Sequence, residues 1–357
     1  MTTGPAAAPV AFGSVFTDHM VGVAFADHRW GEPWIARRGP ISVDPAASGL
    51  HYGQAVFEGL KAYRQPNRDV AFFRIRDHGR RFQASAAHMG MPPLPVELFV
   101  DACFELVGAD EAFVPDEPGN SLYVRPLMLA TTPRLGVRRA TDYLCIFIAS
   151  PVGDYHGGAD HAWTVKAERE HVRATIGGTG AAKCAGNYGA SLAARTRATT
   201  ASGEDFDEVL FLDAAEHRWV QELSAMNVFV VEMRPGLTPT LVTPPLAGTI
   251  LAGITRASLL ELAPALGYRA LTAPISLDRW RHDAEHGIVT EAFATGTGAV
   301  VAPIGRIDEG SRSWTVGDGQ PGPITRRLRA TLLDVQEGRA PDDYGWRSAM
   351  RLRGRGG

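Results

Sequence analysis

The chain has few lysines, few cysteines and no surplus of positive charge. Only Lys61, Lys166 and Lys183 are lysines among 36 basic residues, so chemistry that needs a primary side-chain amine has three candidates. Three cysteines in 357 residues are too few to stabilise the fold through disulfide bonds. The formal net charge is -3, whereas proteins that bind nucleic acid usually carry a basic surplus. We therefore expect no disulfide framework and no nucleic-acid partner.

Long apolar runs are also missing. The most apolar stretch, YLCIFIA over 143–149, is far too short to span a bilayer. The N-terminal residues carry no lysine or arginine before Arg29 and no sustained apolar segment, which makes them a poor secretory signal. These absences lead us to expect a cytoplasmic protein with no membrane partner.

What is present is a chain long enough for about two domains, with 45% hydrophobic residues. Before residue 150, apolar runs between turn signals predict strands, and helical periodicity predicts two helices. The expected strands cover 33–38, 51–64, 69–75, 122–130 and 142–150, and the expected helices cover 77–89 and 95–107.

Residues 151–160, PVGDYHGGAD, form the best candidate for a linker, because they have a proline, three glycines and no periodic apolar pattern. The order of elements changes after it, to a strand, a glycine-rich loop, a helix and further strands. We predict an N-terminal α/β domain over 1–150 and a larger domain over 161–357, with a flexible basic tail from about residue 348. A cleft between two such domains is a favoured place for a ligand.

The glycine-rich loop, GGTGAAKCAGNYG over 177–189, contains Lys183. Its five glycines permit close backbone approach. Asn187 is a candidate cap for the helix that follows, which would place Lys183 four residues before that helix. A lysine amine in such a loop suits a Schiff base to pyridoxal phosphate (PLP). An ordinary surface lysine on a flexible loop remains the alternative at this point.

The sequence does not match a phosphate-binding loop, an esterase motif or a metal site. A phosphate-binding Walker A loop needs glycine before the lysine and serine or threonine after it, but Ala182 and Cys184 stand there. An esterase elbow around Ser191 lacks its second glycine, because Ala193 takes that place. The eleven histidines are scattered without ligand spacing, so we expect no metal.

A PLP site needs three further parts, and the sequence offers a candidate for each. Glu222, before an apolar strand, could keep the pyridine nitrogen protonated. LAGITRASLLELAPAL predicts a helix that starts near Gly253-Ile254-Thr255, and its free N–H groups would bind an anion. The small residues of 295–298, TGTG, could expose N–H groups to a phosphate or a carboxylate.

Together these segments resemble the branched-chain amino acid aminotransferases, which are class IV pyridoxal-phosphate enzymes. The likeness covers about residues 10–347 in eight collinear blocks. They are FTDHM (16–20), LHYGQAVFEGLKAY (50–63), RFQASA (81–86), SLYVRP (121–126), KCAGNYG (183–189), QELSAMNVF (221–229), LAGITR (251–256) and FATGTGAVV (293–301).

The resemblance implies a mixed α/β (α+β), two-domain protein of PLP fold type IV, with the cofactor in the cleft between the domains. It implies transamination of L-leucine, L-isoleucine or L-valine with 2-oxoglutarate, which gives branched-chain 2-oxo acids and L-glutamate, by a homodimer. A D-amino acid transaminase and an aminodeoxychorismate lyase share this fold and are the alternatives. They usually lack the YVRP and FTDHM blocks.

The resemblance also implies roles for cofactor-binding residues. Lys183 would form the Schiff base and move the proton between the substrate α-carbon and C4′ of the cofactor. Glu222 would pair with the pyridine nitrogen, and Tyr188 would bond to the phenolic oxygen. The remaining implied cofactor residues, which hold the phosphate or flank it, are Arg81, Ser224, Ala225, Gly253, Ile254, Thr255 and Thr297.

For the substrate, the resemblance implies an apolar and aromatic pocket with one arginine at its edge. Its residues would be Phe12, Tyr52, Phe57, Tyr123, Arg125 and Val137, with the α-carboxylate at the backbone of Thr297 and Gly298. Tyr52 and Val137 are implied to come from the second subunit, and Arg125 is implied to accept the second carboxylate of glutamate. This chain departs from many relatives at Ala225, where a threonine or glycine is common.

Overall fold

The structure is a computed structural model that describes residues 12–153, 160–202 and 206–350. It divides into two compact units. Within the described residues, unit 1 comprises 12–83, 90–153 and 334–350, and unit 2 comprises 84–89 and 160–333. Each unit has its own sheet and its own helices, which confirms the mixed α/β class. None of the described helices is long and apolar enough to cross a membrane.

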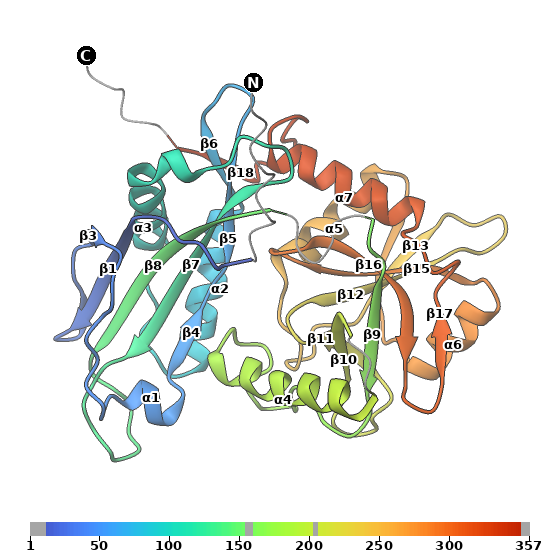
Figure 1. Cartoon of the computed structure of the whole chain (residues 1–357), viewed down its shortest axis with the longest axis horizontal. Coiled ribbons are helices and arrows are strands. Elements are labelled where there is room, and N and C mark those ends of the chain that lie inside the picture. The colour runs from blue at the N-terminus through green and yellow to red at the C-terminus, as the bar shows by residue number, and fades with distance from the viewer. Residues whose placement is uncertain (1–11, 154–159, 203–205, 351–357) are drawn as a thin grey trace, which may run out of the picture. The chain divides into compact units, whose positions relative to one another are not determined.

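Unit 1 is built on an antiparallel sheet in the order β18-β6-β5-β7-β8-β1-β2, with β3 on β1 and β4 on β7 (Figure 1). Its strands are β1 (His19–Ala26), β2 (Arg29–Trp30), β3 (Trp34–Arg37), β4 (Ala55–Phe57), β5 (Leu60–Arg64), β6 (Val70–Phe73), β7 (Ser121–Ala130), β8 (Tyr143–Val152) and β18 (Arg347–Ala349). Its helices are α1 (Ser48–Tyr52), α2 (Ile75–His88), whose last residues group with unit 2, α3 (Val96–Ala109) and the 3₁₀ turn η1 (Glu111–Phe113).

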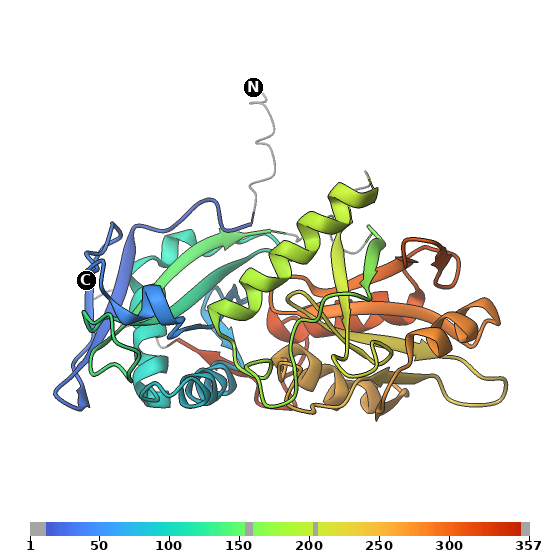
Figure 2. The same cartoon turned by 90° about the horizontal axis from the view of Figure 1, so that it is seen from below.

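Unit 2 is built on a mixed sheet in the order β11-β10-β9-β16-β15-β12-β13-β14, with β17 on β16. Helix α4 packs against β10, as Figure 2 shows. The strands are β9 (Trp163–Glu168), β10 (Glu208–Leu212), β11 (Val220–Leu223), β12 (Asn227–Glu232), β13 (Thr240–Thr243), β14 (Arg269–Thr272), β15 (Val289–Gly296), β16 (Val300–Asp308) and β17 (Ser313–Thr315). The helices are α4 (Ala185–Ser202), α5 (Ile254–Ala265), α6 (Leu277–Glu285) and α7 (Pro323–Gln336), whose last residues group with unit 1.

Aromatic side chains fill the core of each unit. In unit 1, the rings of Phe82, Phe99 and Phe147 form a chain with centroids 5.6 Å apart, and α3 packs on β1 and β8. In unit 2, Phe229 and Phe293 stack at 5.1 Å between β12 and β15. Residues 227–231 of β12 and 291–295 of β15 are all buried, so both faces of these strands are covered.

The two helices expected before residue 110 are confirmed as α2 and α3. The strand expected over 51–64 is wrong in its first part. Residues 48–52 form the helical turn α1, which ends at Gly53 in the left-handed conformation at φ 69°. The rest is split into β4 and β5 with Glu58 and Gly59 between them, although the Glu58 N–H still donates to the Pro126 carbonyl of β7 at 2.9 Å.

The chain end and the linker differ from expectation where the structure describes them. Residues 151 and 152 continue β8, and residues 154–159 of the expected linker lie outside the described residues. Residues 347–349 are strand β18 rather than tail, because Trp346 and Met350 are buried and β18 pairs with β6 in unit 1. Residues 351–357 of the expected tail lie outside the described residues.

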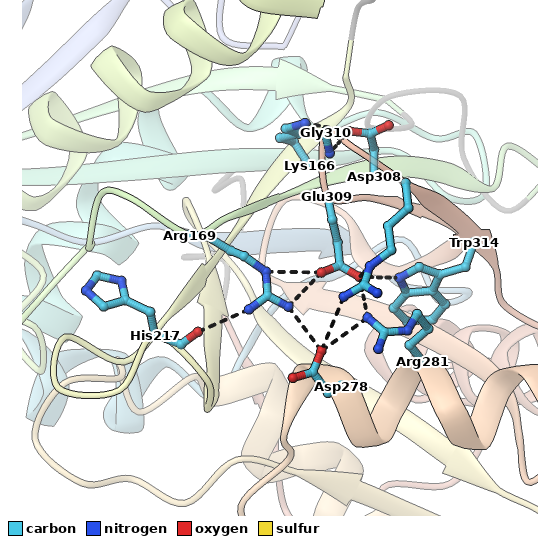
Figure 3. A network of polar contacts seen from close by, with 10 residues as sticks. Lys166, Arg169, His217, Asp278, Arg281, Asp308, Glu309, Gly310 and Trp314 are labelled. Atoms are coloured by element: carbon cyan, nitrogen blue, oxygen red, sulfur yellow. Dashed lines mark hydrogen bonds and ion pairs between the residues drawn. The ribbon is translucent and has the colours of Figure 1, made fainter.

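A cluster of charged side chains fixes one end of the unit 2 sheet (Figure 3). The Glu309 carboxylate follows β16, and only 2% of its side chain is exposed. It accepts hydrogen bonds from Arg169 at 2.6 Å, Arg281 at 3.0 Å and Trp314 at 3.1 Å. Burial alone raises the pKa of Glu309, but the hydrogen bonds from Arg169 and Arg281 outweigh it and hold the pKa below its usual range. The cluster therefore ties the end of β9 to α6 and β17.

Removing this carboxylate is expected to destabilise the protein. We expect Glu309→Gln to lower the free energy of unfolding by about 1–3 kcal/mol at pH 7, because charged hydrogen bonds at a buried acceptor are lost. The folded pKa is below the unfolded one, so this stabilisation is present at neutral pH and disappears as the pH falls below about 4. Urea unfolding at several pH values measures the difference.

The matched control is Asp278→Asn, which removes a carboxylate of the same cluster whose side chain is 56% exposed. A loss below about 1 kcal/mol is expected there, because exposed ion pairs contribute little. Two results would contradict this account. One is an equal loss of unfolding free energy in both variants. The other is a difference in unfolding free energy between Glu309→Gln and the wild type that does not become smaller in acid.

Candidate active site

The lysine loop of unit 2 places its lysine amine beside a phenol. The Nζ atom of Lys183 donates to the Tyr188 hydroxyl at 2.7 Å and lies 5.1 Å from the centre of that ring. The backbone N–H of Lys183 donates to the Ser85 hydroxyl of α2 at 2.9 Å. Both Lys183 and Tyr188 are half-buried, so the lysine is not a freely solvated surface residue. The amine is therefore held at a defined point.

Asn187 does not cap helix α4, contrary to the expectation. The helix already begins at Ala185, only two residues after Lys183. The buried Asn187 side chain instead donates to the carbonyls of Thr179 and Ala182, each at 2.9 Å, and accepts from the Thr179 hydroxyl. It closes the glycine-rich loop on itself, because three contacts inside the loop satisfy more of its polar groups than one cap would.

The carboxylate of Glu222 is buried in β11 of the same unit, with 2% of the residue exposed. One oxygen accepts from the Leu251 N–H at 2.9 Å, and the other accepts from Asn227 at 3.1 Å. Arg173 forms an ion pair with it at 2.9 Å. These donors favour the charged form of the carboxylate, which is the form that pairs with a protonated ring nitrogen.

Arg173 is a site residue that sequence reasoning missed. It is 7% exposed and donates to the carbonyls of Gly180 at 3.3 Å and Thr249 at 3.1 Å, in addition to pairing with Glu222. Gly180 belongs to the lysine loop, so this arginine connects the loop to the carboxylate. The only signal in the sequence is a single charged residue directly before a small and neutral stretch, ATIGGTGAA.

Helix α5 begins at the predicted place, with Gly253 as its N-cap residue. A Cβ on Gly253 would lie 2.0 Å from the Asn227 side-chain oxygen, so only glycine fits. Ile254 and Thr255 are buried in the first turn, whose N–H groups and dipole favour an anion. This helix start suits a phosphate group.

The other predicted cofactor residues of unit 2 lie on turns. The Ser224 hydroxyl oxygen follows β11 and is buried without a hydrogen-bond partner among the described residues. A buried orphan of this kind is what a bound polar group would satisfy. Ala225 beside it is exposed, and Thr297 and Gly298 are half-buried in the turn between β15 and β16. The donor set of unit 2 therefore fits pyridoxal phosphate.

In unit 1, the guanidinium of Arg81 is held by Glu58. The Nε and Nη2 atoms of Arg81 donate to the two carboxylate oxygens of Glu58 at 2.6 and 2.8 Å, and the His78 ring lies 2.9 Å from one of them. Burial alone would raise the pKa of Glu58, but the charge of Arg81 and the hydrogen bond with His78 hold it well below its usual range. Glu58 was missed from the sequence, and it fixes the orientation of Arg81.

Four of the predicted substrate residues come together in unit 1. The rings of Phe12 and Tyr123 are 5.0 Å apart, and Arg125 donates to the Tyr123 hydroxyl at 2.9 Å. The Arg125 guanidinium also lies 4.9 Å from the centre of the Phe57 ring. Its Nε atom is buried without a hydrogen-bond partner among the described residues. This is an aromatic surface with one arginine able to bind a carboxylate.

Tyr52 lies on α1 and Val137 on the loop after β7, both in unit 1. The Tyr52 hydroxyl donates to the Leu135 carbonyl, which ties α1 to the loop after β7. Leu50, Leu135 and Val137 are 59%, 69% and 80% exposed. We call Leu50, Tyr52, Leu135 and Val137 the apolar patch. Among the described residues, no group of three or more His, Cys, Asp or Glu side chains could hold a metal ion.

Comparison with known proteins places the chain in a family. Residues 55–307 match the family model of class IV aminotransferases. A probable branched-chain-amino-acid aminotransferase of Streptomyces coelicolor is 46% identical over 94% of this chain and 91% of that protein. A branched-chain-amino-acid aminotransferase of Mycolicibacterium smegmatis is 43% identical over 95% of this chain and 92% of that protein.

Solved structures agree with the sequence relatives. The Escherichia coli branched-chain amino acid aminotransferase gives a TM-score of 0.76 at 25% identity, over 93% of this chain and 99% of that one. A branched-chain amino acid aminotransferase of T.th., solved with pyridoxamine 5'-phosphate, covers 92% of this chain and 99% of its own, with a TM-score of 0.74 and 28% identity. The same T.th. enzyme was solved with 4-methylvaleric acid, at a TM-score of 0.73.

The chain belongs to the class IV aminotransferases, and it is a PLP-dependent enzyme of fold type IV. Within that class, the resemblance to the branched-chain amino acid aminotransferases is confirmed.

The buried ion pair gives a test that needs no cofactor. We expect Arg173→Met to destabilise the protein by about 3–5 kcal/mol, because it leaves the Glu222 charge buried without its cation. The double variant Arg173→Met with Glu222→Gln is expected to be more stable than Arg173→Met alone, since it removes both charges. Urea unfolding of the apoprotein compares the two variants and Glu222→Gln with the wild type. If the loss of unfolding free energy in the double variant equals the sum of the losses in the two single variants, the two side chains do not interact.

Proposed function

We propose that this enzyme transfers the amino group of L-leucine, L-isoleucine or L-valine to 2-oxoglutarate, giving a branched-chain 2-oxo acid and L-glutamate. The observation that carries this proposal is the pair of fixed groups in unit 2, the Lys183 amine and the buried Glu222 carboxylate. The substrate class comes from relatives named branched-chain-amino-acid aminotransferases, which match over most of this chain.

In this proposal, unit 2 supplies most of the cofactor contacts. The phosphate is held by the N–H groups at Ile254 and Thr255, with Gly253 allowing close approach. Further contacts come from Arg81, Ser224, Ala225 and Thr297. When bound, pyridoxal phosphate supplies an aldehyde that links to amines and a ring that accepts electrons from the substrate α-carbon.

The residues of this chain supply the proton transfers and the orientation. Lys183 would remove the proton from the substrate α-carbon and deliver it to C4′ of the bound cofactor, which requires its amine to be neutral when it accepts the proton. The Tyr188 hydroxyl, 2.7 Å away, orients that amine. Glu222 keeps a positive charge on the ring nitrogen, and its three protein donors keep the carboxylate itself in place.

One pocket has to accept both leucine and glutamate, and the geometry of Arg125 accounts for this. With an apolar side chain bound, Arg125 stays satisfied by the Tyr123 hydroxyl and the Phe57 ring. With glutamate bound, the guanidinium can turn its free Nε edge to the second carboxylate. The α-carboxylate of either substrate binds to the backbone of Thr297 and Gly298.

We also propose that the active enzyme is a homodimer in the cytoplasm. The apolar patch is the supporting observation for the dimer, because it exposes four large apolar side chains on two segments that the Tyr52–Leu135 hydrogen bond joins. The patch includes Tyr52 and Val137, which would then reach the substrate site of the second subunit. All three cysteines are buried free thiols, as is usual in a reducing compartment.

The lysine is tested by removing it. We expect Lys183→Ala to lose the visible absorption of the bound cofactor and to lower the rate of leucine transamination by at least about a thousandfold. The matched control is Lys166→Ala, because Lys166 pairs with Asp308 outside the proposed site. That variant should keep both the spectrum and the activity.

Absorption that persists in Lys183→Ala would overturn the assignment of the amine. Substrate class is decided by steady-state assays of L-leucine, D-alanine and aminodeoxychorismate with the wild-type enzyme. Turnover of D-alanine or aminodeoxychorismate above that of L-leucine would replace the proposed reaction with one of the other two chemistries of this fold.

The dimer is tested by mixing two impaired variants. Val137→Asp should lose most activity, because it puts a charge in the apolar pocket of the second subunit. Lys183→Ala is inactive in its own site. Mixed and exchanged, the two chains should recover about a quarter of the wild-type activity, since half of the dimers are hybrids and each hybrid has one intact site.

Recovery requires that Val137 serve the site of the other chain. The contrary result is an activity of the mixture that equals the sum of the activities of the separate variants, although light scattering shows that hybrid dimers form. Val137 then acts in its own subunit, and this part of the proposal is wrong. A wild-type enzyme that is active as a monomer would overturn the dimer itself.

A further inference from the structure

The hairpin formed by β15 and β16 in unit 2 contains a strained residue. Gly296 pairs with Val300 across the hairpin, and residues 297–299 form its turn. Val300 has φ 62°, the left-handed conformation, and is 3% exposed. A β-branched residue in that conformation is a genuine outlier, because its side chain clashes with its own backbone. Strain of this kind persists only where the surroundings hold it.

The surroundings here hold three consecutive backbone carbonyls. Arg329 of α7 donates from one Nη atom to the Ala299 carbonyl at 2.6 Å and to the Val301 carbonyl at 3.2 Å. The Thr295 hydroxyl donates to the Val300 carbonyl between them, at 2.8 Å. Arg329 is 9% exposed, so its bonds are shielded from water. The strained residue is therefore clamped on both sides.

The clamp fixes the backbone directly after Thr297 and Gly298. The other end of the turn is fixed by the ladder, in which Thr295 pairs with both Asn227 and Val301. A turn that is fixed at both ends presents its N–H groups in one geometry, so a carboxylate binds without first ordering them. The positive charge of Arg329 beside the turn also favours an anion.

We propose that Arg329 is a positioning residue for the α-carboxylate of the substrate, acting through the strained turn at Val300. The inference rests on the proposed function, which places that carboxylate at Thr297 and Gly298. Every substrate of the reaction has an α-carboxylate, so the clamp contributes equally to the amino acids and to the 2-oxo acids. Most of the proposed cofactor contacts, at Lys183, Glu222 and the start of α5, do not involve it, and Thr297 is the one proposed cofactor residue that lies in the clamped turn.

The test compares Arg329→Met with Arg327→Met in the holoenzyme. Arg327 lies two residues away on the exposed side of α7 and donates to the Tyr268 hydroxyl. The probe is 4-methylvalerate, a branched apolar carboxylate without an amino group, titrated by calorimetry. We expect Arg329→Met to raise its Kd, and the KM values of L-leucine and 2-oxoglutarate, by about tenfold or more. Arg327→Met should leave all three unchanged.

Two further measurements decide between positioning and a merely structural role. Cofactor affinity, measured by reconstitution of the apoprotein, should change much less than carboxylate affinity in Arg329→Met. A parallel loss of both, or an unchanged Kd for 4-methylvalerate, overturns the proposal. If the methionine variant does not accumulate, Arg329→Lys repeats the test, because lysine keeps the charge without the planar guanidinium.

The strain has its own test. Val300→Gly should unfold at a higher temperature than Val300→Ala, since glycine adopts a positive φ freely and alanine does not. The reverse order would show that Val300 is not strained. Should the wild type fail to transaminate L-leucine, the proposed function falls, and the 4-methylvalerate titration still reports whether Arg329 supports carboxylate binding.

Discussion

The ion pair between Arg173 and Glu222 is the interaction on which the rest of the site in unit 2 depends. Both side chains are almost fully buried, so removing either one leaves the other charge buried without its counter-charge. The same arginine bonds to the lysine loop and to the segment before α5. One cation thus contacts three segments of unit 2: the lysine loop, the carboxylate in β11 and the segment before α5.

The side chains proposed to hold the cofactor are themselves held by other polar side chains. Glu58 holds Arg81, and Asn227 holds both Glu222 and the carbonyl of Leu251. Side chains that a second set of polar groups locks in one rotamer lose little entropy on binding a ligand. Asn227 lies in β12, whereas Glu58 lies in the short connection between β4 and β5. Both side chains are buried, which helps to keep each of them in one orientation.

Local patterns were enough to predict much of this molecule. Helices α2 and α3 were predicted because Gly90 and the prolines at 92, 93 and 95 interrupt an apolar period, and the start of α5 at Gly253 followed from the same kind of signal. Helix α1 was missed, since five residues of mixed character show no period. Asn187 was predicted to cap helix α4, but its side chain donates to two carbonyls of the glycine-rich loop instead. The local preference of asparagine for helix N-termini did not account for these contacts within the loop.

Some residues of the candidate site were predicted from the sequence, and others were missed. Lys183 was predicted because the chain has only three lysines, and Glu222 was predicted because it precedes an apolar strand. Arg173, Glu58 and Arg329 were missed, because each has a partner far away in the sequence and no motif of its own. Their roles become visible only when distances are known, and the identity of the eight blocks could suggest the family without suggesting these supports.

The position of β18 has a consequence for how the polypeptide is made. This last strand pairs with β6, so the sheet of unit 1 combines segments from both ends of the described chain, with nearly all of unit 2 inserted between them. A ribosome releases the N-terminal strands first and β18 last. Unit 2 can complete its own sheet during synthesis, while unit 1 must wait with one edge open until translation has passed residue 349.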